Sequence, residues 1–293
     1  MRVAQLYENQ EKPVISFEFF PPRDEKAAKG FETVIDNLSQ LEPHYMSVTF
    51  GAGGSTRDGS YQTVKQLMAG KGLPTVAYIA GFGLGPEEIT DVLDRYRDLG
   101  VETIFVIRGD APRNLDQFTP HPDSFKYASD MLAFINERYD FDLGCAGYPE
   151  GHIQAESLEK DIEYLKLKVA NGAKYVVAQY FYDNDYFFRY VDKCRAAGIS
   201  VPIIPGIMPV YSIKMTEMLA KLCGAEITGE LRSGLQEVAG GEKSDVENFG
   251  IDFAVKQCRG LLKNGVAGLH FYTMDRSRSV TEIIRRLRQE NAL

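Results

Sequence analysis

A glutamate in an aromatic run is the first residue whose position suggests chemistry. The run SFEFFPPR begins at residue 16, and Glu18 alternates in it with Phe17 and Phe19. In a strand, neighbouring side chains point to opposite faces, so phenylalanines that pack outward would direct Glu18 inward. Apolar surroundings favour the neutral form of a carboxyl group, which suits a general acid at neutral pH. A structural carboxylate paired with an arginine explains the same pattern equally well.

Other polar side chains stand where apolar runs end. Arg108, Gly109 and Asp110 place a cation and a carboxylate around a glycine, which could hold a phosphate and a heterocycle or form an ordinary surface ion pair. Gln179 interrupts an apolar run, and a buried amide needs partners, either the edge of a planar ligand or a neighbouring strand. A glycine-rich stretch from residue 51 could admit a phosphate or a flat ring, or be a simple turn. The remaining candidates are Thr49, Tyr148, His152, Tyr272 and Arg276.

Eight β-rich apolar runs alternate with amphipathic stretches and would have to position these residues. The runs cover residues 14–19, 45–50, 74–80, 103–109, 142–149, 174–181, 201–209 and 268–274. Eight strand–helix units over about 250 residues predict a closed (β/α)8 TIM barrel, with its active site at the carboxyl ends of the strands. A doubly wound open sheet is the alternative, but no dinucleotide-binding fingerprint follows the first run.

We expect a single α/β domain over residues 1–293, with an N-terminal extension (1–13) and a helix–loop insertion around 226–245. Hydrophobic residues make up 44% of the chain and charged residues 25%, as in globular proteins. The net charge of -8 argues against a nucleic acid or an anionic membrane as partner. The four cysteines show no metal-ligand spacing, and we expect reduced thiols and no metal. Neither a membrane-spanning run nor a signal-peptide pattern is evident, which predicts a cytoplasmic protein.

Seven motifs together make the chain resemble the bacterial methylenetetrahydrofolate reductases, of the flavin-dependent single-barrel type, over residues 14–288. The motifs are SFEFFPPR (16–23), SVTFGAGG (47–54), RGD (108–110), YASD (127–130), YPEGH (148–152), IIPGIMP (203–209) and HFYTMDR (270–276). The resemblance implies that NADH or NADPH reduces a flavin at the carboxyl ends of the strands. The reduced flavin then passes hydride to 5,10-methylenetetrahydrofolate, giving 5-methyltetrahydrofolate. A homo-oligomer is expected.

The resemblance also implies roles for single residues. Glu18 would protonate nitrogen ten of the folate, and Asp110 would lie between flavin and pterin. Gln179, Tyr272 and Arg276 would contact the folate. The residues implied to contact the flavin are Thr49, Arg108, Gly109, Asp110, Tyr127, Ala128, Ala146, Tyr148, His152, Asp161 and Lys168.

Several positions depart from the family pattern. FAD is the expected cofactor. Tyr164 and Leu167 replace an asparagine and an arginine on the flavin side, which makes FMN the alternative. Thr75 stands where many relatives have histidine, and Met215 and Leu219 occupy folate-side positions. A second hypothesis is therefore a flavin-bearing subunit of an electron-transfer complex that does not accept NAD(P)H directly. A non-catalytic folate-binding barrel is a third.

Overall fold

The computed structural model describes residues 2–8, 12–22, 24–50, 57–110 and 119–293. The strands are β1 (Val14–Phe19), β2 (Tyr45–Val48), β3 (Thr75–Ala80), β4 (Thr103–Ile107), β5 (Asp142–Gly147), β6 (Ala173–Ala178), β7 (Ile203–Ile204), β8 (Gly206–Ile207) and β9 (Gly268–Tyr272). The helices are α1 (Val3–Glu8), α2 (Glu25–Ser39), α3 (Arg57–Lys71), α4 (Pro86–Leu99), α5 (Ala128–Arg138), α6 (Leu158–Ala170), α7 (Asn184–Ala196), α8 (Ile213–Cys223), α9 (Gly229–Val238), α10 (Lys243–Lys263) and α11 (Arg278–Gln289).

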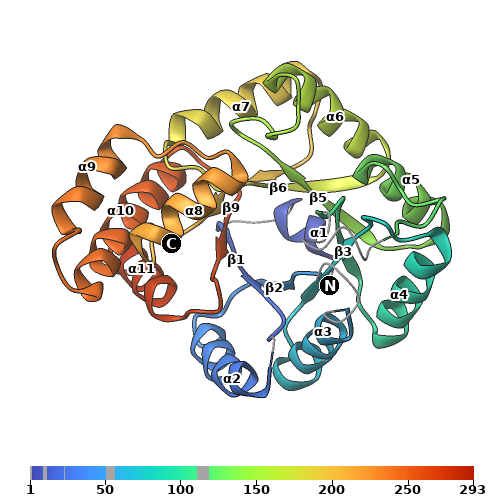
Figure 1. Ribbon diagram of the computed structural model, residues 1–293, viewed down its shortest axis with the longest axis horizontal. Coiled ribbons are helices and arrows are strands. Elements are labelled where there is room, and N and C mark those ends of the chain that lie inside the picture. The colour runs from blue at the N-terminus through green and yellow to red at the C-terminus, as the bar shows by residue number, and fades with distance from the viewer. Residues whose placement is uncertain (1, 9–11, 23, 51–56, 111–118) are drawn as a thin grey trace.

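The strands form one sheet that curves around a central axis, with most helices outside it (Figure 1). Its order is β7-β6-β5-β4-β3-β2-β1-β9-β8, and every pairing is parallel. Parallel strands joined by helical crossovers are the pattern that the sequence predicted. The single-domain (β/α)8 barrel is confirmed.

The seventh predicted strand is divided in two by a proline. β7 pairs with β6, whereas β8 pairs with β9. Pro205 lies between them and has no N–H to donate to a ladder, although its carbonyl accepts the N–H of His270 over 3.1 Å. The barrel therefore has eight strand positions and closes across residues 203–207.

Aromatic side chains fill the barrel interior. The rings of Tyr78 and Phe105 stack with centroids 4.4 Å apart, and Phe105 also packs against Tyr175 of β6. Gly144 on β5 leaves room for them, because a Cβ atom there would lie 2.4 Å from Cζ of Tyr175. The interior is thus a packed core rather than a pore, as is usual for eight-stranded barrels.

Helix α1 closes the N-terminal end of the barrel and appears inside the ring of strands in Figure 1. The N–H of Ala4 donates to Oδ2 of Asp142 over 2.6 Å, and the hydroxyls of Tyr7 and Tyr45 are 3.0 Å apart. Asp142 is the first residue of β5 and Tyr45 the first of β2, so the helix is fastened to the bottom of the barrel. The expected N-terminal extension contains this helix.

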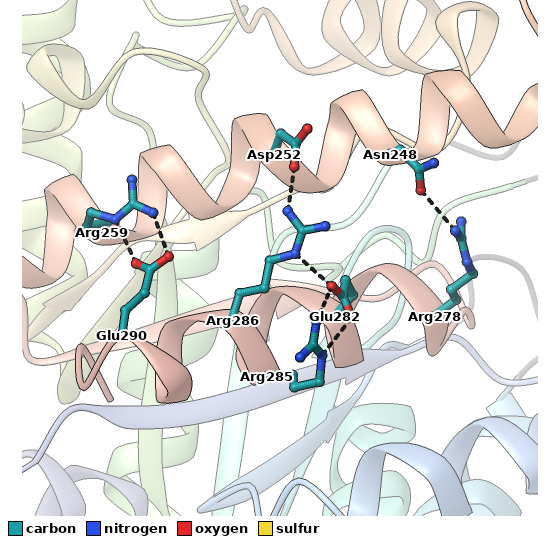
Figure 2. A network of polar contacts seen from close by, with 8 residues as sticks. All are labelled: Asn248, Asp252, Arg259, Arg278, Glu282, Arg285, Arg286 and Glu290. Atoms are coloured by element: carbon teal, nitrogen blue, oxygen red, sulfur yellow. Dashed lines mark hydrogen bonds and ion pairs between the residues drawn. The ribbon is translucent and has the colours of Figure 1, made fainter.

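The outer helices are marked by a glycine stop signal and by surface charge. α4 ends at Gly100, whose φ of 88° is the left-handed conformation that favours glycine. α9 lies within the range expected to hold the insertion. The basic residues of α11 form surface ion pairs along α10 (Figure 2): Arg286 bonds Asp252 over 2.5 Å, and Glu290 of the following segment bonds Arg259. These charged side chains are largely exposed and form a solvated face.

Across the described ranges, no helix combines the length and the apolar character needed to cross a membrane. Those ranges also hold no group of three or more histidine, cysteine or acidic side chains arranged to bind a metal ion. The four cysteines are free thiols.

Candidate active site

Glu18 lies inside the barrel near the end of β1. Phe17 and Phe19 point the other way, and Phe19 packs edge-on against an aromatic ring of α2 with the centroids 5.6 Å apart. Only 5% of Glu18 is exposed. Its Oε2 accepts a hydrogen bond of 2.6 Å from the Tyr78 hydroxyl and lies 3.5 Å from Nε2 of His270. The strand alternation predicts this orientation; the observed partners are a tyrosine and a histidine rather than the arginine that the sequence left open.

The end of β4 carries Arg108, Gly109 and Asp110. Gly109 has a φ of 81°, and a Cβ atom there would lie 2.9 Å from Cβ of Ala80, so the position requires glycine. Arg108 donates to Oε1 of Gln154 over 2.7 Å and forms no ion pair with Asp110 among the described residues. Asp110 is exposed. Its negative charge, after the larger effects of burial and of Asp161, raises the pKa of Tyr148, which directly follows β5.

A second cluster follows β5 and includes two residues of α6. The rings of Tyr148 and His152 meet edge to face, with centroids 4.7 Å apart. Lys168 donates to the carbonyl of Ala146 over 2.5 Å, and its Nζ lies 5.7 Å from the centroid of the Tyr148 ring. Asp161 is buried and accepts the backbone N–H of His152; burial raises its pKa, and the positive charge of Lys168 opposes that rise. These residues hold a cation beside an aromatic edge.

Gln179 directly follows β6 and is half-buried. Its Oε1 accepts the N–H of the next residue over 3.0 Å. It lines a small cavity of about 10 Å³ together with Tyr148, Glu150 and Cys223, which has room for about one water molecule. Oε2 of Glu150 accepts the N–H of Glu226 over 2.9 Å and so ties the β5 loop to the segment after α8. The end of α8 therefore packs close to Gln179.

A tight turn after Tyr272 carries Arg276. Met274 and Asp275 both have positive φ values, 49° and 54°, which are uncommon for residues other than glycine. Asp275 accepts an N–H over 3.0 Å from the segment after β1 and thereby fixes the turn. Arg276 is exposed, with its guanidinium 5.1 Å from the centroid of the Tyr211 ring. Tyr272 is the register partner of Glu18, and its hydroxyl donates to the carbonyl of Ala178 over 3.2 Å. Burial, and then the charge of Glu18, raises the pKa of Tyr272.

The remaining sequence candidates follow β2 or begin α5; the N–H of Thr49 donates to the carbonyl of Phe19, next to Glu18, over 2.9 Å. Thr49 is half-buried and its carbonyl accepts the hydroxyl of Ser60 over 2.9 Å. Tyr127 and Ala128 begin α5, and the Tyr127 ring is exposed beside Lys126. Most of the glycine-rich stretch expected to form a binding loop, residues 51–56, lies outside the described residues.

Tyr78 and His270 are two contacts of Glu18 that the sequence analysis did not single out as site residues. His270 lies on β9, which pairs with β1, and is the register partner of Ser16. Tyr78 lies on β3, which pairs with β2, and its side chain points into the barrel. A tyrosine and a histidine at inward register positions next to a buried carboxyl group are the signal that could have found them.

The donor groups at the end of β4 and around β5 fit a flavin. Arg108 and Lys168 can hold a phosphate, whereas Tyr148 and His152 offer an aromatic edge to a flat ring. Gly109 leaves its backbone open to a close approach. These groups follow the neighbouring strands β4 and β5, at the same end of the barrel as Glu18.

A (β/α)8 barrel with a buried carboxyl group and with arginine, aspartate and glutamine side chains at the carboxyl ends of its strands has the architecture of a barrel enzyme. The chain belongs to the methylenetetrahydrofolate reductase family, whose model matches residues 2–288.

Individual relatives agree with this assignment. The chain is 34% identical over 278 residues to the 5,10-methylenetetrahydrofolate reductase of Escherichia coli, covering 93% of this chain and 90% of that protein. It is also 34% identical over 289 residues to methylenetetrahydrofolate reductase (NADH) 1 of Arabidopsis thaliana, covering 95% of this chain and 49% of the plant protein. The chain spans about half the length of the plant and yeast relatives it matches.

A solved structure shows the same fold. It is a Clostridium thermocellum protein described as binding two copies of 5-methyl-5,6,7,8-tetrahydrofolic acid. Its TM-score is 0.68 at 18% identity, with 98% of each chain covered. At this identity the likeness concerns the fold alone.

Proposed function

We propose that this chain reduces 5,10-methylenetetrahydrofolate to 5-methyltetrahydrofolate, with a flavin as hydride carrier and NADH or NADPH as electron source. The observation that carries the proposal is the carboxyl group of Glu18, buried at the end of β1 and fixed through one oxygen by Tyr78. Membership of the methylenetetrahydrofolate reductase family supports the substrate. The small cluster of cations and aromatic rings after β4 and β5 supports the flavin.

Glu18 is proposed to protonate nitrogen ten of the folate. Tyr78 and His270 both approach Oε2, and no described residue hydrogen-bonds Oε1. Oε1 is therefore the oxygen that can present a proton to a substrate at the barrel mouth, by which we mean the carboxyl ends of the strands. Protonation opens the five-membered ring of the substrate and leaves an iminium at nitrogen five, which accepts hydride.

The residues after β4 and β5 are proposed to bind and orient the flavin. When bound there, a flavin would supply the chemistry of hydride transfer between the nicotinamide and the methylene carbon. Arg108 and Lys168 would hold its phosphate, and Tyr148 and His152 its ring. The charge of Asp110 would favour the cationic form of the substrate. The other proposed flavin contacts are Thr49, Gly109, Tyr127, Ala128, Ala146 and Asp161.

FAD is the proposed cofactor and FMN the alternative. FMN is the alternative because Tyr164 and Leu167, which are exposed on α6, offer no charged group to the adenosine end of a dinucleotide. On the substrate side, Gln179 and Tyr272 would contact the pterin, and the exposed guanidinium of Arg276 is free to reach an anionic group of the folate.

An exposed apolar patch favours a second candidate, a flavin-bearing subunit that receives electrons from a partner protein. Met218 and Leu222 are one helical turn apart on α8, and both are exposed. Ile153 is also exposed and lies against Gly224, at the end of that helix. Large exposed apolar side chains gathered near a site mark a protein contact. A second copy of this chain in a homo-oligomer would cover the same patch.

The free thiols agree with the cytoplasmic location that we propose.

Two measurements test the proposal. Acid extraction of the purified yellow protein should release FAD; release of FMN would identify the shorter cofactor, and a protein that binds no flavin would overturn the proposal. Anaerobic mixing with NADH or NADPH should bleach the flavin within seconds, and methylenetetrahydrofolate should then restore the colour. No bleaching, with activity recovered on addition of a partner protein, would favour the second candidate.

A further inference from the structure

A line of buried polar side chains continues below Glu18 into the barrel. His270 on β9 is 1% exposed, and its Nδ1 lies 2.8 Å from Oγ of Ser16. Its other nitrogen, Nε2, lies 3.5 Å from Oε2 of Glu18. Ser16 and Glu18 are successive inward residues of β1, so the imidazole of the neighbouring strand bridges them.

The line extends to the helix at the bottom of the barrel. The Tyr45 hydroxyl lies close to Ser16 and 3.0 Å from the hydroxyl of Tyr7 in α1. Burial raises the pKa of Tyr45 to about 12, so its hydroxyl keeps its proton at neutral pH. The Tyr45 ring stacks on His270 with the centroids 6.3 Å apart. The hydroxyl of Ser16 has one proton, and it can donate that proton to an unprotonated Nδ1 of His270.

The groups on either side of the imidazole, Ser16 and Glu18, indicate which of its nitrogens carries hydrogen. If Ser16 donates to Nδ1, a neutral imidazole carries its proton on Nε2, the nitrogen that faces Glu18. Nε2 has no hydrogen-bond partner within the described part of the chain, and the Glu18 carboxyl group is the acceptor that it faces. A carboxylate is acceptor-only, so an Nε2–H is what an ionised Glu18 requires.

We propose that His270 is a positioning residue, held by Ser16 in the tautomer with hydrogen on Nε2, which stabilises the carboxylate that forms when Glu18 gives up its proton. This inference rests on the proposed role of Glu18 as the acid. As the O–H bond of Glu18 breaks, its proton moves to the substrate nitrogen and the electron pair stays on the carboxyl group. Nε2–H of His270 and the Tyr78 hydroxyl then donate to that carboxylate, and both keep their own protons.

The alternative role for the same residues is structural filling of the barrel. A buried imidazole and hydroxyl carry a desolvation cost that apolar side chains of the same shape would avoid. Filling alone does not require a particular tautomer, nor does it act on one half-reaction more than on the other. The tautomer and the half-reactions therefore separate the two roles.

The first test reads the tautomer directly. The chain has four histidines, so the side-chain 15N signals of a labelled sample can be assigned by single substitutions. His270 should show its proton on Nε2 in the unsubstituted protein, and Ser16→Ala should abolish that preference. Ser47→Ala is the matched control, because Ser47 is the register partner of Glu18 on β2 and is equally buried, while its hydroxyl has no hydrogen-bond partner in the described ranges. A proton on Nδ1 in the unsubstituted protein would overturn the proposal.

The second test measures the effect of these residues on the rate of the folate half-reaction. With pre-reduced protein and saturating methylenetetrahydrofolate, Ser16→Ala and His270→Leu should slow the oxidation of the flavin by about tenfold to a hundredfold, as expected for loss of a hydrogen bond to a charged group. Substrate affinity should change little, and His270→Gln, which keeps a donor, should recover part of the rate. Equal losses in His270→Gln and His270→Leu, or parallel losses in flavin reduction, would mean that the residue only fills space. If the unsubstituted protein itself does not oxidise reduced flavin with this substrate, the proposed function fails, while the tautomer measurement still stands.

Discussion

The hydroxyl of Tyr78 donates a 2.6 Å hydrogen bond to Oε2 of Glu18, across two strand positions of the barrel. Tyr78 is itself buried, and burial followed by the charge of Glu18 raises its pKa, so the hydroxyl acts as a donor at all physiological pH values. The bond leaves one carboxyl oxygen fixed and the other directed to accept or release a proton. The orientation of the proposed acid therefore depends on a residue of a different strand.

Removal of that donor should impair folate reduction selectively. In Tyr78→Phe, the carboxylate formed on proton donation loses a charge-assisted hydrogen bond, which is worth about 1.5–3 kcal/mol. We expect the rate of the folate half-reaction to fall by about tenfold to a hundredfold, with flavin reduction little changed. Stopped-flow absorbance measures both half-reactions, and an equal loss in the two would contradict a specific role for the hydroxyl.

Gly109 should be required for flavin binding rather than for folding alone. A methyl group at this position would contact Ala80 and would also be strained by the φ of 81°. Gly198→Ala is the matched control, because its φ of 86° imposes the same backbone strain and no atom lies within 4 Å of the place that its new methyl group would take. Flavin titration should show a much larger loss of affinity in Gly109→Ala than in Gly198→Ala. Similar losses would mean that backbone strain, not the approach of the ligand, explains the glycine.

The barrel interior should not tolerate a methyl group at Gly144. Its Cβ atom would lie 2.4 Å from the Tyr175 ring and 2.7 Å from Phe105, and overpacking of this kind costs about 1–3 kcal/mol. Urea unfolding of Gly144→Ala should show this loss of stability. Gly240→Ala, with open space around its Cβ position, should be nearly neutral. A neutral Gly144→Ala would contradict the tight aromatic packing.

His152 should make stability depend on pH. Burial, and then the positive charges of Arg108 and Lys168, lower its pKa from the ordinary value of 6.5. A lowered pKa means that the neutral imidazole contributes stability above pH 6.5, and that this contribution is lost as the pH falls through the lowered value. Between pH 7 and pH 5, His152→Gln should therefore lose less stability than the unsubstituted protein. Identical pH dependence of urea unfolding in the two proteins would show that burial and these cations do not lower the pKa of His152.

The sequence pattern predicted the barrel because strand and helix periodicity is local. It overestimated the length of most strands at their carboxyl ends; the second run, for example, was expected to reach residue 50, whereas β2 ends at Val48. The reason is that apolar residues such as Phe50 and Phe181 continue past the strand ends and are buried in the core without joining the ladder. The division of the seventh strand at Pro205 follows from the missing N–H of proline.

The location of Glu18 was predictable, but its partners were not. Alternation with Phe17 and Phe19 is a property of one strand and can be seen in the residues themselves. Tyr78 is 60 residues away, and His270 is even more distant from β1. Their contacts depend on the register between strands, which no local pattern contains.

The central claim is that Glu18 is the proton donor of the folate half-reaction. Glu18→Gln keeps the size of the side chain and the hydrogen bond acceptor but cannot supply a proton. In anaerobic stopped-flow experiments, its flavin should still be reduced by the nicotinamide donor, and the reduced flavin should persist when methylenetetrahydrofolate is added. Reoxidation of the flavin by the folate at the unsubstituted rate, or loss of both half-reactions to the same extent, would contradict the claim.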